Sequence, residues 1–156
     1  MSAPIPFPSV EYFEALGKLM DENRARHEHI GPIDCTTQFT VISMEDESLN
    51  RHFQVEFELY SVVGVREVDA SESEKADFVM ETDGYVWQEM FENIRENGGK
   101  PDLEHSLNRL SLPGIPIRVW GSDPLGRDEF FRFNQSLQEY VNACAQIETV
   151  YPGLDD

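Results

Sequence analysis

Histidine and cysteine are the side chains of this 156-residue chain best suited to acid–base, nucleophilic or metal chemistry. His27 and His29 are the only close pair of histidines, and they lie at the end of a helix predicted to run to about residue 26. Side chains at i and i+2 of a helix diverge, so the two rings would share a metal ion only if the helix had already ended. Asp34 and Cys35 could then complete a site of mixed ligands. A solvated helix end is the interpretation we prefer, and we expect no metal.

The other two histidines, His52 and His105, have no neighbours that would make them catalytic. His52 is predicted on the solvent-facing side of a strand, and His105 follows Glu104 on a short helix. The sequence has no Gly-x-Ser-x-Gly nucleophile turn, no phosphate-binding glycine loop and no Cys-x-x-Cys pair. With 30 Asp and Glu residues, a pair of carboxylates carries no information. The sequence therefore gives no reason to expect an enzyme, a catalytic residue or a cofactor.

The charge balance limits the possible partners. Thirty acidic residues against 12 basic ones give a net charge of −18. The basic residues are scattered, whereas binding to phosphates requires clustered positive charge. We therefore expect no nucleic acid and no attachment to an anionic membrane, and we expect any protein partner to be basic.

The two cysteines and the start of the chain bear on the compartment. Cys35 and Cys144 do not make a disulfide framework and are expected to be reduced, half-buried thiols. The first residues, MSAPIPFPS, lack the features of a signal peptide. Apolar runs are far too short for a membrane span. These features predict a soluble protein of the cytoplasm with no stable membrane insertion.

The elements that would position a binding site are organised around residues 76–94. Residues 78–80 have strand character, and Asp83 is a suitable N-cap for the helix that follows. One wide apolar stripe then recurs at helical spacing; it consists of Val86, Trp87, Met90, Phe91 and Ile94. This stripe is heavier in large side chains than a packing face needs. It is either core, which is commoner, or the wall of a cavity.

The remainder is predicted to form a single domain over residues 1–156, with an extended lead-in at 1–8 and a loose tail at 147–156. Residues 69–75 are expected to be a solvated loop, a turn is expected at Pro113-Gly114, and Ser122-Asp123-Pro124 is expected to start a helix. The predicted elements are, in order, a helix over 9–26, strands over 34–45, 52–59, 62–68 and 77–81, a helix over 83–94, a short helix from Asp102, an edge strand over 115–120, and a last helix ending near residue 146.

This order of elements, together with three segments, resembles the sterol carrier protein 2 (SCP2-like) domain family. Residues 62–79 are similar to the family's strand, acidic loop and Ala-Asp-Phe motif, which is matched by residues 76–78. Residues 83–94 are similar to the next helix, and residues 114–121 to a glycine-bounded strand before the closing helix. The resemblance covers nearly the whole chain. It implies an α+β fold with a five-stranded, mostly antiparallel sheet, helices over one face, and an apolar tunnel that binds sterols, fatty acids or fatty acyl-CoA without chemistry.

Two features depart from the family pattern. The family's lysine-rich glycine strand is here PGIPIRVWG, which is one residue longer and contains prolines, so ligand contacts in this region do not transfer directly. Many relatives that exchange lipid with membranes are basic, whereas this chain is strongly acidic. Its charge favours passing the ligand to a basic protein partner or to an enzyme that receives it.

We therefore expect an SCP2-like domain that carries or presents a hydrophobic small molecule, such as a sterol, steroid, fatty acid or fatty acyl-CoA. Large apolar side chains on the central and final helices support this expectation. The expected ligand contacts are Phe57, Trp87, Met90, Phe91, Ile94, Leu107, Leu110, Trp120, Phe130, Phe133 and Leu137. One alternative is an accessory or structural subunit with a filled interior. Another is a small isomerase- or hydratase-type enzyme, which would need a buried carboxyl group of raised pKa near His52 or His105.

Overall fold

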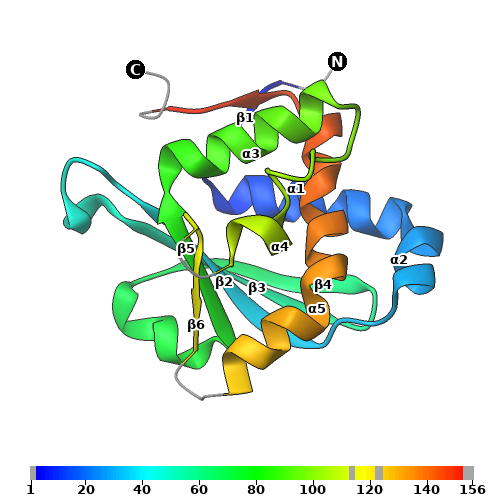
Figure 1. The fold of residues 1–156 in the computed structure, drawn as a ribbon, viewed down its shortest axis with the longest axis horizontal. Coiled ribbons are helices and arrows are strands. Elements are labelled where there is room, and N and C mark those ends of the chain that lie inside the picture. Colours follow the sequence, from blue (N-terminus) through cyan, green and yellow to red (C-terminus); the bar gives the residue numbers. More distant parts are fainter. Residues whose placement is uncertain (1–2, 113–114, 122–124, 153–156) are drawn as a thin grey trace.

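The computed structural model describes residues 3–112, 115–121 and 125–152, and its centre is a five-stranded sheet with helices packed on one face (Figure 1). The strand order is β4-β3-β2-β5-β6, and all neighbours are antiparallel except β2 and β5. The strands of this sheet are β2 (Cys35–Ile42), β3 (Arg51–Glu58), β4 (Ser61–Val68), β5 (Phe78–Asp83) and β6 (Arg118–Trp120). The predicted α+β class and the mostly antiparallel sheet are confirmed.

Alternation along the strands decides which face of the sheet is apolar. Phe39 on β2 lies opposite Phe53 on β3 and Met80 on β5, and all three side chains are buried under the helices. The residues between them point to the other face, where Gln38 lies opposite Gln54. One face of the sheet therefore carries the core, and the other carries polar groups.

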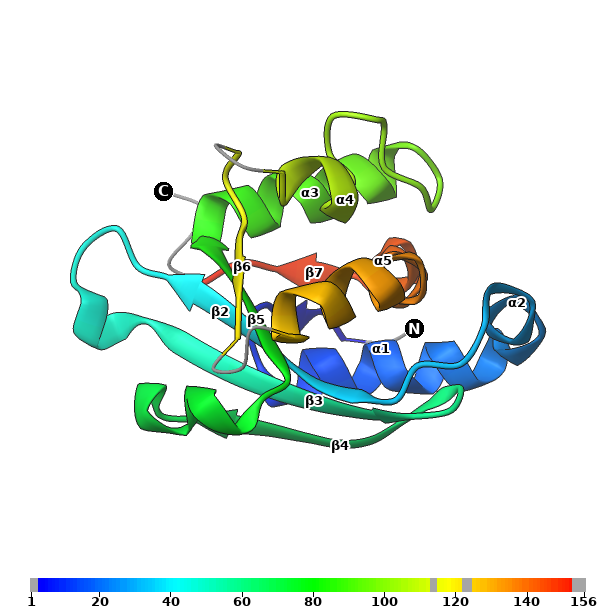
Figure 2. The same ribbon diagram turned by 60° about the horizontal axis from the view of Figure 1, so that its bottom comes forward.

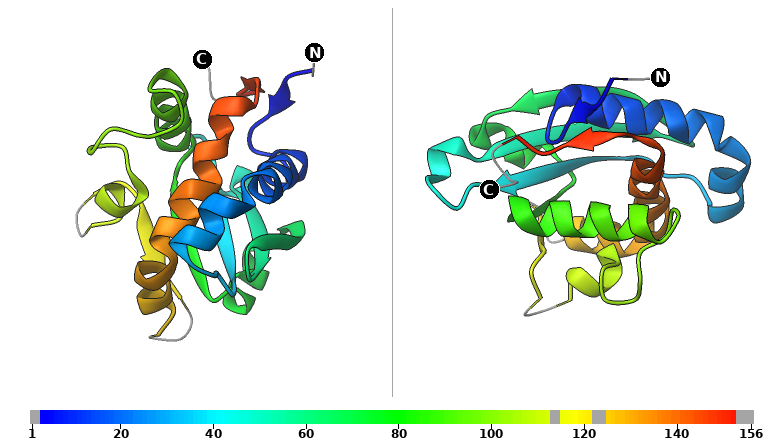
Figure 3. Two further views of the ribbon diagram at one scale, coloured as in Figure 1. Left: turned by 90° about the vertical axis from the view of Figure 1, so that its right-hand side faces the viewer. Right: turned by 90° about the horizontal axis from the view of Figure 1, so that it is seen from above.

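The helices form one layer over the apolar face (Figure 2). They are α1 (Val10–Glu22), α2 (Arg24–Ile30), α3 (Gly84–Glu96), α4 (Leu107–Leu110) and α5 (Leu125–Asn142). In the left view of Figure 3, α5 lies between α3 and α1. Ser9 caps α1 as predicted, because its side chain accepts a hydrogen bond from the backbone amide of Tyr12 at 3.0 Å. The predicted helix over 9–26 is two helices, because α1 ends at Glu22 and α2 follows after Asn23.

Two predicted caps differ from the structure. Asp83 occupies the N-cap position of α3, but its side chain makes no capping hydrogen bond. Asp102 does not begin a helix: its carboxylate accepts from the backbone amides of Glu104 and His105, and α4 begins later, capped by Ser106. The turn predicted at Pro113-Gly114 and the helix start predicted at residues 122–124 lie outside the described residues. β6 is shorter than the predicted strand over 115–120 and lies at the sheet edge, as predicted.

A 3-10 helix, η2 (Ala70–Lys75), covers part of the polar face, where the sequence predicts only a solvated loop. Gln54 donates to the side-chain oxygen of Gln38 at 3.0 Å and to the backbone oxygen of Glu72 at 2.9 Å. Gln38 in turn donates to Ser73 at 2.8 Å. The polar alternation of β3 therefore supports a buried amide network here and does not simply face water.

The first and last strands of the described chain lie side by side (Figure 1). β1 (Ile5–Pro6) pairs in parallel with β7 (Thr149–Val150), and Phe7 between β1 and α1 is fully buried. The 3-10 helix η3 (Ala143–Gln146) connects α5 to this pair. The prediction of a loose tail from residue 147 is therefore wrong as far as residue 150, because those residues complete a small second sheet.

Candidate apolar binding site

The apolar stripe of α3 is buried against the sheet, as the spacing of its residues predicts. Trp87 and Met90 are fully buried. The indole nitrogen of Trp87 donates a hydrogen bond of 3.0 Å to the backbone oxygen of Thr40 on β2. This bond satisfies the polar end of the indole and fixes the ring over the central strands.

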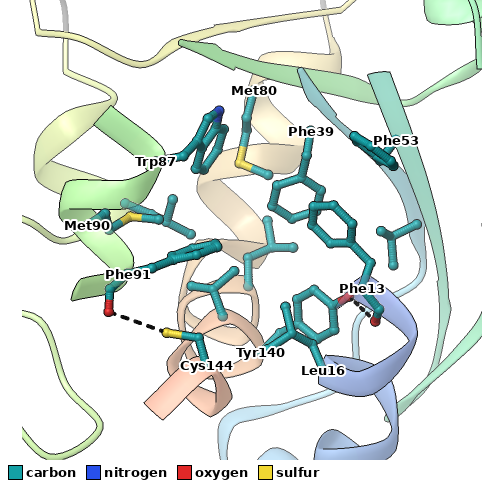
Figure 4. Packing of buried hydrophobic residues seen from close by; sticks show 14 of the residues in the cluster. Phe13, Leu16, Phe39, Phe53, Met80, Trp87, Met90, Phe91, Tyr140 and Cys144 are labelled. Carbon is teal, nitrogen blue, oxygen red and sulfur yellow. Dashed lines mark hydrogen bonds between the residues drawn. The ribbon is translucent and has the colours of Figure 1, made fainter. Parts of the chain in front are cut away.

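Side chains fill the space around Trp87 (Figure 4). The ring centroids of Trp87 and Phe39 are 5.7 Å apart, and those of Phe39 and Phe13 are 4.8 Å apart. Met80 and Met90 lie beside the indole. The α3 stripe therefore faces an aromatic and thioether layer that extends across the sheet to α1.

The predicted ligand contacts fall into two groups. Trp120 is half-buried and alternates on β6 with Val119, which takes the position on the core face opposite Met80. The other predicted contacts belong to the main core; they are Phe57, Trp87, Met90, Phe91, Ile94, Leu107, Leu110, Phe130, Phe133 and Leu137. The best-defined cavities in the described part of the chain are lined by other residues. In this structure the interior is thus occupied by the protein's own side chains.

An apolar groove of about 420 Å³ lies outside this core, between the β2–β3 hairpin and the start of α3. We call it the hairpin groove. Its lining residues are Pro8, Val41, Ile42, Ser43, Met44, Glu45, Leu49, Arg51, Gly84, Tyr85 and Pro152. Met44 is 76% exposed, Leu49 is 55% exposed and Tyr85 is 52% exposed. Large apolar side chains that converge on one hollow are typical of a binding surface.

Polar contacts fix the hairpin in the shape that exposes these side chains. The side-chain oxygen of Asn50 accepts from the backbone amide of Ser43 at 2.7 Å, and Asp46 accepts from the amide of Ser48 at 2.9 Å. The second contact caps the 3-10 helix η1 (Glu47–Leu49). Sequence reasoning missed this groove. The available signal was Met44 and Leu49 within the otherwise polar segment SMEDESLN.

Arg51 closes one side of the hairpin groove. Its guanidinium makes two hydrogen bonds of 2.8 Å to the carboxylate of Glu67, and a third of 3.0 Å to the backbone oxygen of Pro8. The bonds to Arg51 lower the pKa of Glu67, and those to Glu67 raise the pKa of Arg51. The positive charge of Arg51 is therefore already matched, and the contact anchors the N-terminal segment beside the groove.

The hairpin groove lies against one end of the Trp87 layer. Val41 belongs both to the groove lining and to the buried core. Gly84, which also lines the groove, is one turn before Trp87 on α3. A molecule seated in the groove would therefore be next to the interior that the sequence predicts as the binding site.

The close histidine pair diverges, as predicted. His27 is buried, and burial lowers its pKa, whereas His29 is exposed. The described residues contain no group of three or more His, Cys, Asp or Glu side chains that could hold a metal ion. Cys35 and Cys144 are both buried free thiols.

His52 and His105 are the two histidines beside which the enzyme alternative requires a buried carboxyl group of raised pKa. His52 lies 3.0 Å from the hydroxyl of Thr40, and burial lowers its pKa. His105 lies 2.7 Å from the carboxylate of Asp102, which raises the pKa of the histidine and lowers that of Asp102. The pKa of Glu67, the carboxyl group paired with Arg51 near His52, is also lowered. The pKa values of Glu67 and Asp102 are thus both lowered, whereas a carboxyl group that acts as a general acid needs a raised pKa.

Comparison with known proteins identifies the fold. No family model matches the sequence, and no curated protein matches it. The solution structure of the conserved hypothetical protein TT1886 from Thermus thermophilus, described as possibly a sterol carrier protein, superposes with a TM-score of 0.64 at 16% identity, over 98% of this chain and 96% of that one. A crystal structure of sterol carrier protein 2 superposes with a TM-score of 0.59 at 18% identity, over 88% of this chain and 95% of that one. None of the described helices has the length and apolar character needed to cross a membrane. The chain thus has the α+β fold of sterol carrier protein 2.

Proposed function

We propose that this protein binds and carries a hydrophobic small molecule, of the sterol, steroid, fatty acid or fatty acyl-CoA class, and that the molecule is seated at the hairpin groove. The hairpin groove is the observation that carries the proposal. Its volume of about 420 Å³ is within the usual range for small-molecule sites, and Met44, Leu49 and Tyr85 offer it apolar surface that would otherwise face water. Burial of that surface by a ligand is favourable, at roughly 25 cal/mol per Å².

The interior contacts predicted from the sequence form the second part of the proposed site. Met80 and Met90 are buried next to Trp87, which lies one turn after the groove residue Gly84 on α3. Methionine side chains are unbranched and rearrange at low cost. A ligand that displaces them would contact Trp87, and its far end would reach the apolar residues of α4 and α5.

A titration with a fluorescent fatty acid and a fluorescent sterol tests the proposal, with Trp emission followed in parallel. We expect saturable binding of one probe per chain. Leu49→Ser removes apolar surface from the groove and should weaken the probe affinity about tenfold, as the loss of one buried leucine contact implies. Leu103→Ser is the matched control, because Leu103 is 89% exposed and does not line the groove.

Comparison of the two variants distinguishes binding at the groove from nonspecific adsorption of the probe. Equal weakening by both substitutions would show that the probe adsorbs without a site. No saturable binding for any apolar class, in a protein that unfolds cooperatively, would refute the proposed function.

The filled interior favours a second candidate, an accessory or structural subunit that binds no small molecule. The predicted contacts on α3, α4 and α5 are each 8% exposed or less, which is typical of an ordinary core. Native mass spectrometry of protein purified from cells discriminates the two functions. Co-purified lipid supports the carrier, and its absence together with a negative titration supports the accessory subunit.

A further inference from the structure

Two rows of acidic side chains lie near the hairpin groove. The first row is on the hairpin tip, where Glu45, Asp46 and Glu47 are consecutive and exposed. The second row is on the outer face of α3, where Glu89, Glu92 and Glu96 are exposed at the spacing i, i+3, i+7. The groove thus has negative charge at the hairpin tip on one side, and a second acidic row begins on α3 one turn beyond Tyr85.

The second row lines a trough of its own, of about 480 Å³, that adjoins the groove. Tyr85 lines both the trough and the groove, so the two form one continuous surface along α3. The basic groups among the described lining residues are Arg51 and His105. Arg51 is paired with Glu67, and the ring of His105 is 3.7 Å from Glu89. The negative charge of this surface is therefore left largely uncompensated.

We propose that this surface docks a basic amphipathic segment of another protein. The apolar side chains of the segment would enter the groove between Met44 and Tyr85, and its Lys and Arg side chains would lie over the two acidic rows. Complementary charge speeds encounter and fixes the register of such a complex, while the groove supplies the buried apolar contact. A site with this pattern recognises a helix or strand that has one apolar and one basic face.

The charges argue against the other occupants of the groove. A second copy of this chain carries the same net charge of −18, so a self-complementary contact through this surface would place the acidic rows against each other. An anionic bilayer would be repelled in the same way. A basic protein segment is the occupant whose charge matches both rows.

This inference rests on the proposed function in one respect, since the docked segment and the small molecule would compete for the hairpin groove. Docking of the basic partner would then unload the ligand at the place where it is needed. The docking itself requires no ligand, so the two events are measured separately.

The probe for docking is a synthetic amphipathic peptide of Leu and Lys, of about 14 residues or four helical turns. Two control peptides carry Glu in place of Lys and Ser in place of Leu. We expect saturable binding of the Leu/Lys peptide by fluorescence anisotropy, and an affinity that falls steeply as NaCl is raised from about 50 to about 300 mM. Equal binding of the Ser/Lys peptide would show that the interaction is nonspecific attraction between charges, and would overturn the proposal.

A pair of charge-matched variants locates the site. The triple variant Glu89→Gln, Glu92→Gln and Glu96→Gln removes the α3 row. The control triple Glu11→Gln, Glu14→Gln and Glu22→Gln removes three exposed charges from α1, which packs on β4 away from α3 (Figure 3). Both change the net charge equally. We expect the α3 triple to weaken peptide binding about tenfold and the α1 triple less than about twofold. Equal losses would overturn the proposed site.

The link to the small molecule is tested last, with the fluorescent fatty acid bound. Added Leu/Lys peptide should release the probe competitively, and the α3 triple should release it less readily. Peptide binding at the groove without probe release would overturn the unloading step. Probe binding with no peptide binding would overturn the docking proposal and leave the proposed function intact. Peptide binding with no probe binding would refute the proposed binding of a small molecule and support the docking surface.

Discussion

The backbone oxygen of Asp77 lies so close to Gly126 that a β-carbon on Gly126 would overlap with it. Asp77 is itself fixed to β2, because its carboxylate accepts from the backbone amide of Thr36 at 2.7 Å and its own amide donates to the oxygen of Thr36 at 2.8 Å. The first turn of α5 therefore rests directly on the backbone at the start of β5. Glycine is required there for close approach.

We predict that Gly126→Ala destabilises the protein. Alanine would favour the helix by about 1 kcal/mol. The overlap with a backbone atom cannot be relieved by a side-chain rotation, so we expect a net loss of about 1–3 kcal/mol from overpacking. Urea unfolding measures the difference. Gly64→Ala on β4 is the control, because its β-carbon would meet no atom within 4 Å. Unchanged or increased stability of Gly126→Ala would contradict the close approach.

Phe133→Ala should cost about 3–5 kcal/mol of unfolding free energy, the usual range for emptying a packed aromatic position. Phe133 is 8% exposed and belongs to the main core, which is the reason for expecting the full cost. The same variant is titrated with the fluorescent fatty acid. A loss of only about 1–2 kcal/mol with altered ligand affinity would place Phe133 on an open cavity. A large loss with unchanged affinity would remove α5 from the proposed site.

Stability should fall as the pH is lowered, partly because of His27. Burial lowers the pKa of His27 in the folded state below its value of about 6.5 in the unfolded chain. Below that value the unfolded state takes up the proton first, so folding stability declines until the folded-state pKa is passed. Urea midpoints between about pH 7.5 and pH 5 measure the decline. His27→Gln should reduce this decline in the urea midpoint. His29→Gln, at the exposed neighbouring histidine, is the control and should leave the decline unchanged. An identical pH dependence in all three proteins would exclude His27 as a cause.

Both thiols should be unreactive in the native protein. Burial raises the pKa of Cys144 to about 12, and it raises the pKa of Cys35 as well. Thiolate is the reactive form, so little of it is present at neutral pH. A thiol-reactive disulfide reagent should modify neither residue before unfolding, and both in urea. Fast native labelling of Cys35→Ser would show that Cys144 is accessible.

The sequence predicts the parts of the fold that local patterns specify. The helical spacing of Trp87 and Met90 identifies the buried face of α3, and the alternation through Phe53 identifies β3. The side chain of Ser9 specifies the start of α1 because a cap is a contact within one turn. These features need no knowledge of the rest of the chain.

Features that depend on distant contacts were missed or wrong. η2 covers Gln54, and β7 pairs with β1. Both contacts join segments that are far apart in the sequence, so local composition predicted a loop at η2 and a loose tail at β7. The hairpin groove was missed for a related reason. Met44 and Leu49 are too far apart to form a periodic pattern, and Tyr85 joins them only in the folded chain. The sequence indicated an apolar interior but gave no sign of where a molecule would approach it.

The parallel pairing of β1 with β7 joins the first described strand of the chain to the last. The amide of Ile5 donates to the oxygen of Glu148 at 2.9 Å, and the amide of Phe7 donates to the oxygen of Val150 at 2.9 Å. Because the two strands run in the same direction, the chain enters β1 and leaves β7 at opposite ends of the pair. The pairing therefore connects the first and last described strands by backbone hydrogen bonds. Removal of either strand would leave the other without its backbone partner.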